Sequence, residues 1–511
     1  MSTAPTGAPT HARRAFSNAA LNLVAGVLPF PVALVTVPAV IRGFGLERYG
    51  VLAMAGVVLA YFALLDVGLG RAGTRFLARS LTADGSDAAE TFWTVVALGA
   101  VVGLAGAVIL LGVAAPLVED LLRVPASLVA ESRSAFRVLA AAVPLAVMVP
   151  TLLGALEAQR RFDLVAAIQV PAAVLGLLAP LVVLPWTTHL APAILAIAAV
   201  QAGAFAAALA ACLATIPRVR RSLRVRPRVV GELLGYGRWV AVSNVVGPLM
   251  VNADRLAIGA MLSVRLVTFY AAPFELVTRL SLVPSSLMRA MFPLFSADRT
   301  PDVRDARALA VDAARAIALV LGPVAVLVVA LAPDALRLWL GADFARLSAS
   351  SLALLAVGVT INALAMVPFW LLQGLGRPDL CAKFHLFELV LYVPLLFLLL
   401  GWWGITGAAA AWTLRVALDG VLLVGAARRL VGLGEHRDRL RTLAVYAALL
   451  ALAFVLSHLV ATRLATGASR LVGAVVLASA TGTVGCRMLL SAAERAVAVA
   501  AAQAVLRRRS A

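Results

Sequence analysis

Four ionisable residues lie deep within the largely apolar stretch 243–295, which also has Arg265 at a turn and Arg289 near its end. Asp254 and Arg255 stand midway along the first of two membrane-spanning helices predicted there, and Glu275 and Arg279 stand one helical turn apart on the second. A charged side chain at the centre of a bilayer costs about 3 kcal/mol on insertion scales. We therefore expect the four to face one another or a water-filled cavity, with this hairpin lining the cavity.

The two arginines of this hairpin have a chemistry that suits anionic ligands. A guanidinium group is planar and permanently charged, and it binds phosphate or carboxylate in a bidentate manner. We predict that Arg255 and Arg279, together with Asn244 and Arg415, face the headgroup of an anionic substrate.

The charged residues within the predicted spans could serve either helix packing or function. Glu275–Arg279 and Arg415–Asp419 are both spaced i,i+4, so each pair can neutralise itself on one helix face and serve packing alone. The acidic groups can equally bind a coupling ion or partner an arginine, and the sequence does not decide between these roles. The residues concerned are Asp66, Asp254, Glu275, Glu388 and Asp419.

Composition defines the class of protein that carries these charges. Of the 511 residues, 62% are hydrophobic and 14% are charged, against about 25% charged in soluble domains. Apolar runs repeatedly exceed the ~20 residues that cross a bilayer, which predicts an all-α polytopic membrane protein. We count about fourteen transmembrane helices, at 19–41, 49–70, 92–118, 135–156, 164–186, 190–215, 237–262, 266–292, 311–332, 347–373, 383–401, 404–427, 442–462 and 468–490.

The net charge of +19 is explained by membrane orientation, so no nucleic acid partner is expected. Basic residues concentrate in alternate loops between the spans, and such loops stay in the cytoplasm. Both termini are therefore expected to be cytoplasmic, and the family resemblance described below implies the bacterial cytoplasmic (inner) membrane.

An internal repeat suggests how the spans are grouped. Asn22 and Tyr49 in the first half match Asn244 and Tyr270 in the second at nearly the same separation, with six spans between the members of each pair. This predicts two six-helix bundles of the same orientation, a parallel repeat related by a pseudo-twofold axis along the membrane normal. Two C-terminal helices lie outside the repeat. The expected parts are an N-terminal tail (1–18), the first bundle (19–215), a basic linker (216–236), the second bundle (237–427), a linker with helices 13 and 14 (428–490) and a basic tail (491–511).

Motifs for enzyme chemistry are not supported. The three cysteines are far apart, and the five histidines form no metal-binding spacing. The glycines of Gly68 to Gly73 fit a nucleotide-loop pattern but follow a predicted span rather than a strand. We expect no catalytic residue, no metal and no cofactor.

Several segments resemble Wzx-type polysaccharide flippases, a family of the multidrug/oligosaccharidyl-lipid/polysaccharide exporter (MOP) superfamily. They are Tyr49 to Ala78, Ser243-Asn244, Asp254-Arg255-Leu-Ala-Ile-Gly259, Phe292-Pro-Leu-Phe295, Leu372 to Asp379, Glu388, Gly407-Ala-Ala-Ala-Ala-Trp412 and Arg415. The resemblance covers roughly residues 15 to 430 and is weak over the last two spans.

This resemblance implies a flippase that moves undecaprenyl-pyrophosphate-linked oligosaccharide units across the membrane by alternating access, for polysaccharide biosynthesis. The expected partners are this lipid-linked substrate, membrane lipids, a proton or sodium gradient and polysaccharide assembly proteins. The alternative is a MATE-like cation-coupled multidrug antiporter or a lipid II flippase of the same fold. A membrane glycosyltransferase or polymerase is less favoured, because the outward loops are short.

Overall fold

The structure is a computed structural model, and all its described elements are helical. It describes residues 28–64, 73–74, 77–78, 80, 88–216, 219–220, 224–225, 230–231, 250–295, 303–432, 437–464 and 467–496. Within these ranges there is no strand, and eleven helical stretches are long and apolar enough to cross a membrane. The prediction of an all-α, multi-pass membrane protein is confirmed.

The chain divides into two compact units, Met1–Ala272 and Pro273–Ala511. The division lies inside the range predicted for the second bundle. The predicted domain limits, the grouping into six-helix bundles and the pseudo-twofold relation stay predictions.

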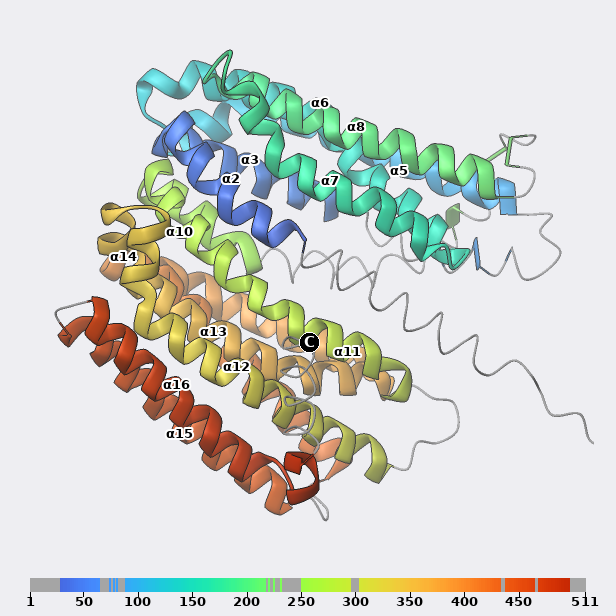
Figure 1. The fold of residues 1–511 in the computed structure, drawn as a ribbon. Helices are drawn as coiled ribbons and strands as arrows, with labels where there is room; N and C mark the ends of the chain where they lie inside the picture. The colour runs from blue at the N-terminus through green and yellow to red at the C-terminus, as the bar shows by residue number, and fades with distance from the viewer. Residues whose placement is uncertain are drawn as a thin grey trace, which may run out of the picture. The chain divides into compact units, whose positions relative to one another are not determined.

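Unit 1 is built around α6, which packs against α5 and α8 (Figure 1). Apolar residues cover α6 on most sides, and such a helix is expected in the interior of a bundle. Its residues Leu152, Leu153 and Leu156 are at most 4% exposed and pack with Phe92 and Cys212. The helices of this unit are α2 (Pro29–Phe44), α3 (Leu46–Leu64), α5 (Ala88–Pro116), η1 (Leu117–Leu121), α6 (Ala126–Ala158), α7 (Phe162–Val183), α8 (Leu190–Thr215), a helical segment at 250–261 and most of α10 (Val264–Thr278).

Unit 2 is built around α13, which packs against both α12 and α14. Its core contains Met288, Phe295, Ile317 and Leu371, all at most 4% exposed. The helices are the end of α10, η2 (Arg279–Ser281), α11 (Leu282–Phe295), α12 (Val303–Trp339), α13 (Ala342–Gly374), α14 (Pro378–Val431), α15 (Arg437–Arg463) and α16 (Gly467–Leu489).

α14 contains two of the predicted spans, joined at Gly404. The backbone there has φ 56° and ψ −139°, outside the helical region, and residues other than glycine rarely adopt such a positive φ. The chain turns so tightly that a Cβ at Gly407 would lie 1.8 Å from the carbonyl oxygen of Leu399. The two halves of α14, before and after Gly404, therefore run back along each other.

The predicted spans correspond well to these helices. α14 spans two of them, α2 is a shorter apolar helix over the end of the first, and the segment at 250–261 is the end of the seventh. The remaining ten spans each match one candidate membrane helix.

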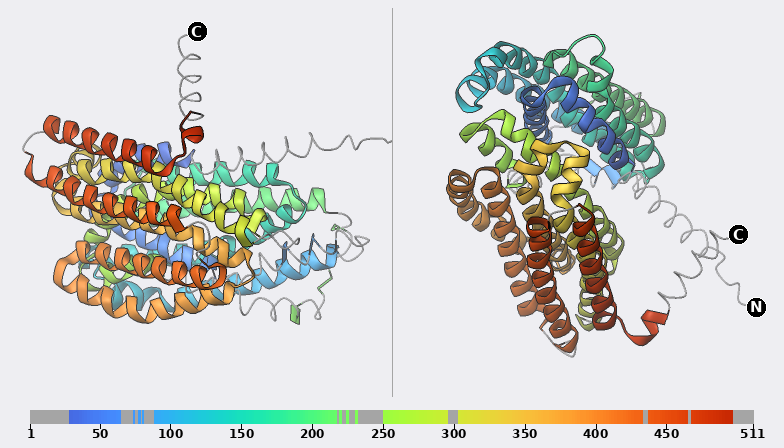
Figure 2. Two further views of the ribbon diagram at one scale, coloured as in Figure 1. Left: turned by 90° about the horizontal axis from the view of Figure 1, so that it is seen from below. Right: turned by 60° about the vertical axis from the view of Figure 1, so that its left-hand side comes forward.

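α15 and α16 lie side by side (Figures 1 and 2) and both pack on α12. Ionic contacts join them to α12 at separate places. Asp312 accepts from Arg439 of α15 at 3.1 Å, and Asp334 accepts from Arg470 of α16 at 2.9 Å. These two helices therefore belong to the packed body of unit 2.

A short helix after α16 begins with reciprocal bonds between Ser491 and Glu494. The amide of Ser491 donates to Glu494 Oε2 at 2.7 Å, and the amide of Glu494 donates to Ser491 Oγ at 3.2 Å, which is a capping box. The first of these bonds is the main reason why the pKa of Glu494 lies below its usual value.

Candidate functional site

Asp254 and Arg255 are buried in unit 1, on the segment at 250–261. Asp254 is 0% exposed and Arg255 is 8% exposed. The carboxylate of Asp254 accepts a hydrogen bond from the Arg255 backbone amide at 2.7 Å and another from the hydroxyl of Tyr270 on α10. Tyr61 of α3 lies within electrostatic reach of both residues. Three helices therefore bring polar groups together at this point within unit 1.

Glu275 and Arg279 belong to unit 2 and lie at an irregular place in a helix. Glu275 is on the regular α10, whereas Arg279 begins η2, a single 3₁₀ turn before α11. Both side chains are half-buried. A 3₁₀ turn has about 3.0 residues per turn and often marks a hinge in a longer helix. The i,i+4 spacing of Glu275 and Arg279 therefore does not correspond to one continuous α-helix.

Glu388, Arg415 and Asp419 form a cluster in unit 2 between the two halves of α14. Arg415 Nη1 lies 3.3 Å from Glu388 Oε2, and the two side chains are 8% and 0% exposed. The same guanidinium lies over the ring of Tyr392, 5.7 Å from its centroid. The sequence offered Arg415 a partner one turn along its own helix, Asp419, and also named Glu388 as an acid that could partner an arginine. The ion pair found is instead with Glu388, because the turn at Gly404 brings the first half of α14 against the second.

Asp66 and Asn244 lie outside the described residues. Among the residues that the structure does describe, no group of three or more His, Cys, Asp and Glu side chains could hold a metal ion.

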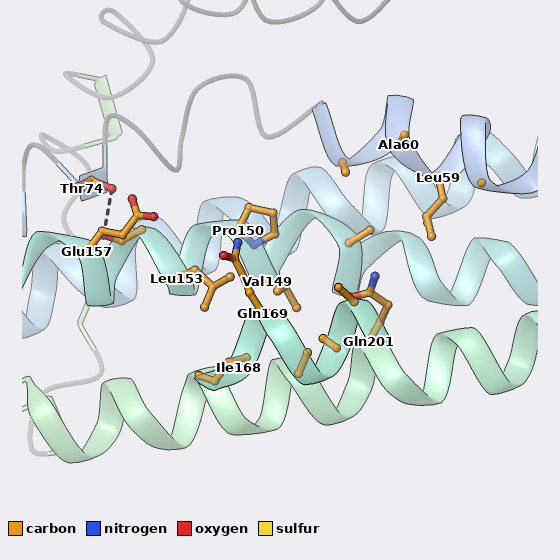
Figure 3. A pocket seen from close by; sticks show the side chains of 17 residues that line it. Leu59, Ala60, Thr74, Val149, Pro150, Leu153, Glu157, Ile168, Gln169 and Gln201 are labelled. Carbon is orange, nitrogen blue, oxygen red and sulfur yellow. Dashed lines mark hydrogen bonds between the residues drawn. The ribbon is translucent and has the colours of Figure 1, made fainter. Parts of the chain in front are cut away.

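A cavity of about 670 Å³ opens in unit 1 between α3, α6, α7 and α8 (Figure 3). Most of its lining is apolar, but Glu157, Gln169 and Gln201 supply a carboxylate and two amides from three different helices. None of these three was predicted as a site residue. The available signal was a glutamine inside each of two predicted spans and a glutamate directly after a third.

A second cavity, of about 730 Å³, lies in unit 2 between α12, α13, α14 and α15. Its walls are apolar apart from Arg307 and Arg428. It contains none of the predicted site residues.

Comparison with known proteins places the chain in a family. The family model described as polysaccharide biosynthesis protein matches residues 42–349. This match covers more than half of the chain, so the chain belongs to that family of polysaccharide biosynthesis proteins. A Shigella flexneri protein named "Putative O-antigen transporter" is 27% identical over 414 residues, which cover 80% of this chain and 96% of the relative.

Solved structures show the same fold at low identity. An inward-facing multidrug resistance MATE family transporter of the MOP superfamily superposes with a TM-score of 0.70 at 15% identity, covering 81% of this chain and 98% of the other. The lipid II flippase MurJ, in an inward closed conformation, gives a TM-score of 0.67 at 10% identity, covering 92% and 99%.

These relatives are named as transporters or flippases, and none as an enzyme. The predicted resemblance to polysaccharide flippases of the MOP superfamily is confirmed. The chain is therefore a multi-pass membrane protein of a polysaccharide biosynthesis family, and its fold is that of a MATE transporter and of the flippase MurJ.

Proposed function

We propose that this protein moves undecaprenyl-pyrophosphate-linked oligosaccharide units from the cytoplasmic to the outer leaflet by alternating access. The substrate class agrees with the family and with the name of the Shigella relative. The proposal also places the protein in the bacterial cytoplasmic membrane with both termini in the cytoplasm, as the distribution of basic loops predicts.

The observation that carries the proposal is the presence of arginines within apolar helical segments, of which the one at Arg279 is long enough to cross a membrane. Arg255 is 8% exposed in unit 1, and Arg279 stands half-buried at the 3₁₀ turn of unit 2. A cation at membrane depth is costly and usually serves a substrate or ion pathway. A pyrophosphate headgroup needs cationic partners when it leaves water, and a guanidinium group binds it in bidentate fashion. We assign Arg255, Arg279 and Asn244 to contact with this headgroup.

Arg415 has a different assignment from the one its sequence position suggested. Its Nη1 donates to the fully buried Glu388, so we assign it to balancing buried acidic charge.

Complementation tests the headgroup assignment. In a bacterial strain that lacks its own polysaccharide flippase, Arg255→Ala and Arg279→Ala should each abolish surface polysaccharide while the protein still inserts in the membrane. Arg265→Ala is the matched control, because Arg265 is an exposed arginine at the start of α10, and it should complement fully. Normal polysaccharide from both test variants would show that Arg255 and Arg279 serve packing.

A MATE-like antiporter would give a different result. Vesicles containing the protein would then expel cationic dyes and leave lipid-linked oligosaccharide unmoved. That outcome would replace the proposed substrate with a cationic one.

A further inference from the structure

Glu388 and Asp419 form a pair of buried carboxyl groups on opposite halves of α14. Glu388 is 0% exposed and Asp419 is 7% exposed. The two residues are nearly equidistant along the chain from the turn at Gly404, so the antiparallel halves bring them to the same level. Their carboxyl groups interact electrostatically.

The hydrogen bonding of this pair is incomplete. Glu388 Oε2 accepts from Arg415, but Glu388 Oε1 and Asp419 Oδ1 are buried with no hydrogen-bond partner among the described residues. A buried carboxylate oxygen that lacks a donor is strongly disfavoured. A proton placed on one of these oxygens removes a charge and also supplies a donor.

The charges of the three residues also indicate that the two acids share one proton. Arg415 contributes one positive charge, and two ionised carboxylates would contribute two negative ones. The site would then hold a net negative charge at membrane depth, which is strongly disfavoured by the loss of hydration. One proton shared by the two acids makes the cluster neutral.

Among the described residues, the charged groups within electrostatic reach of Glu388 are Asp419 and Arg415. On α14, His385 and Cys381 lie within electrostatic reach of Asp419, and Tyr392 lies against Arg415. On α13, the helix packed against α14, Phe369 stacks on His385, and no charged residue occurs between Arg346 and Gly374. Among the described residues, His385 is therefore the one remaining group near the pair that could acquire a positive charge.

We propose that Glu388 and Asp419 hold one exchangeable proton, balanced by Arg415, and that this proton is the ion coupled to transport. A proton fits better than a metal cation, because the guanidinium 3.3 Å from Glu388 repels any further positive ion that the pair would have to bind. When the site meets water, the O–H bond breaks, the proton passes to a water molecule, and its bonding electrons remain on the carboxylate. The coupling role rests on the proposed transport function, whereas the proton site itself does not.

Infrared spectroscopy of the purified full-length protein tests the site without any substrate. A protonated carboxyl group has its own carbonyl stretching band, which shifts on exchange into D₂O. At neutral pH the wild-type protein should show this band. Glu388→Gln and Asp419→Asn should each abolish it, since the single remaining carboxylate is then balanced by Arg415. Absence of the band in the wild type, or its persistence in both variants, would overturn the proposal.

Two further variants test whether the infrared band depends on the charge at position 415 and on these particular carboxyl groups. Arg415→Lys keeps the positive charge and should keep the band, even if packing is weakened. Asp343→Asn, which changes an exposed carboxyl group on α13, should leave the band unaltered. A band lost in Arg415→Lys would contradict the charge-balance argument.

The coupling role is measured in proteoliposomes loaded with lipid-linked oligosaccharide. An imposed pH gradient should stimulate translocation by the wild type, and Glu388→Gln should lose that stimulation. Stimulation by a sodium gradient alone would overturn the coupling role. If no oligosaccharide moves under any gradient while the infrared band is present, the proposed substrate fails and the proton site stands.

Discussion

At the scale of single residues, the bond between Tyr270 and Asp254 connects two helices inside unit 1. Both side chains are 0% exposed, and the tyrosine hydroxyl donates to a carboxylate that also accepts from the amide of Arg255. Charge-assisted bonds in a buried setting are stronger than neutral ones. This contact holds Asp254, and with it the adjacent Arg255, in a defined position.

Tyr270→Phe should therefore lower the stability of the protein in detergent by about 1 to 2 kcal/mol. The phenylalanine keeps the packing and removes the donor, so a thermal-shift assay should report a lower melting temperature. Thr462→Val is the control, because its hydroxyl is exposed and bonds within its own helix. Equal melting temperatures for Tyr270→Phe and the wild type would show that this bond contributes little.

The charged residues of α14 were predictable from the sequence, but their pairing was not. The sequence correctly indicated that Arg415, Asp419 and Glu388 are intramembrane charges, but the i,i+4 rule paired Arg415 with the wrong acid. That rule describes one continuous helix and carries no information on which helix folds back against it. The predicted break between the spans 383–401 and 404–427 agrees with the turn at Gly404, but it does not show which side chains of the two spans meet.

At the scale of elements, the turn in α14 depends on glycine for two separate reasons. Gly404 has a positive φ, and Gly407 allows the close approach to Leu399. A Cβ at position 407 would overlap backbone atoms, which cannot move aside as a flexible side chain can.

Gly407→Ala should destabilise unit 2 by about 3 kcal/mol or more, because the new methyl group overlaps the backbone. Gly401→Ala provides the matched control, since a Cβ there meets nothing within 4 Å. Fluorescence-detected size-exclusion chromatography after heating should show early loss of the monodisperse peak for Gly407→Ala alone. Similar curves for the two variants would mean that the turn relaxes without cost.

The ion pairs that attach α15 and α16 to α12 predict a salt-sensitive contribution to stability. Arg470 is 20% exposed, bonds Asp334 at 2.9 Å and also donates to the carbonyl of Leu464. Arg470→Gln should cost about 1 kcal/mol at low salt and less at high salt, because salt screens the pair. Arg463→Gln changes an exposed arginine at the end of α15 and should have little effect. A cost for Arg470→Gln that does not change with salt would argue against an electrostatic origin.

At the scale of the whole molecule, the apolar run lengths were sufficient to predict the fold class and nearly every span. The bilayer requires long apolar helices whatever their partners, so this information is local in the sequence. The unit 1 cavity could not be predicted in the same way. Gln169 and Gln201 lie on different helices, and only the packing of α6, α7 and α8 shows that they line one cavity with Glu157.

Orientation in the membrane is a second property of the whole chain. The basic loops predict that the C-terminus is cytoplasmic. A green fluorescent protein fused after Ala511 should therefore fluoresce, and alkaline phosphatase fused at the same place should be inactive. The reverse pattern would invert the assignment of every loop.

The central claim is translocation of a lipid-linked oligosaccharide, and its most direct test uses purified protein in proteoliposomes. Undecaprenyl-pyrophosphate-linked oligosaccharide is placed in one leaflet, and a lectin outside the vesicles measures how much becomes accessible with time. We expect rapid exposure with the wild-type protein, and with Arg255→Ala no exposure above that of empty vesicles. Equal rates in vesicles with and without the wild-type protein would contradict it.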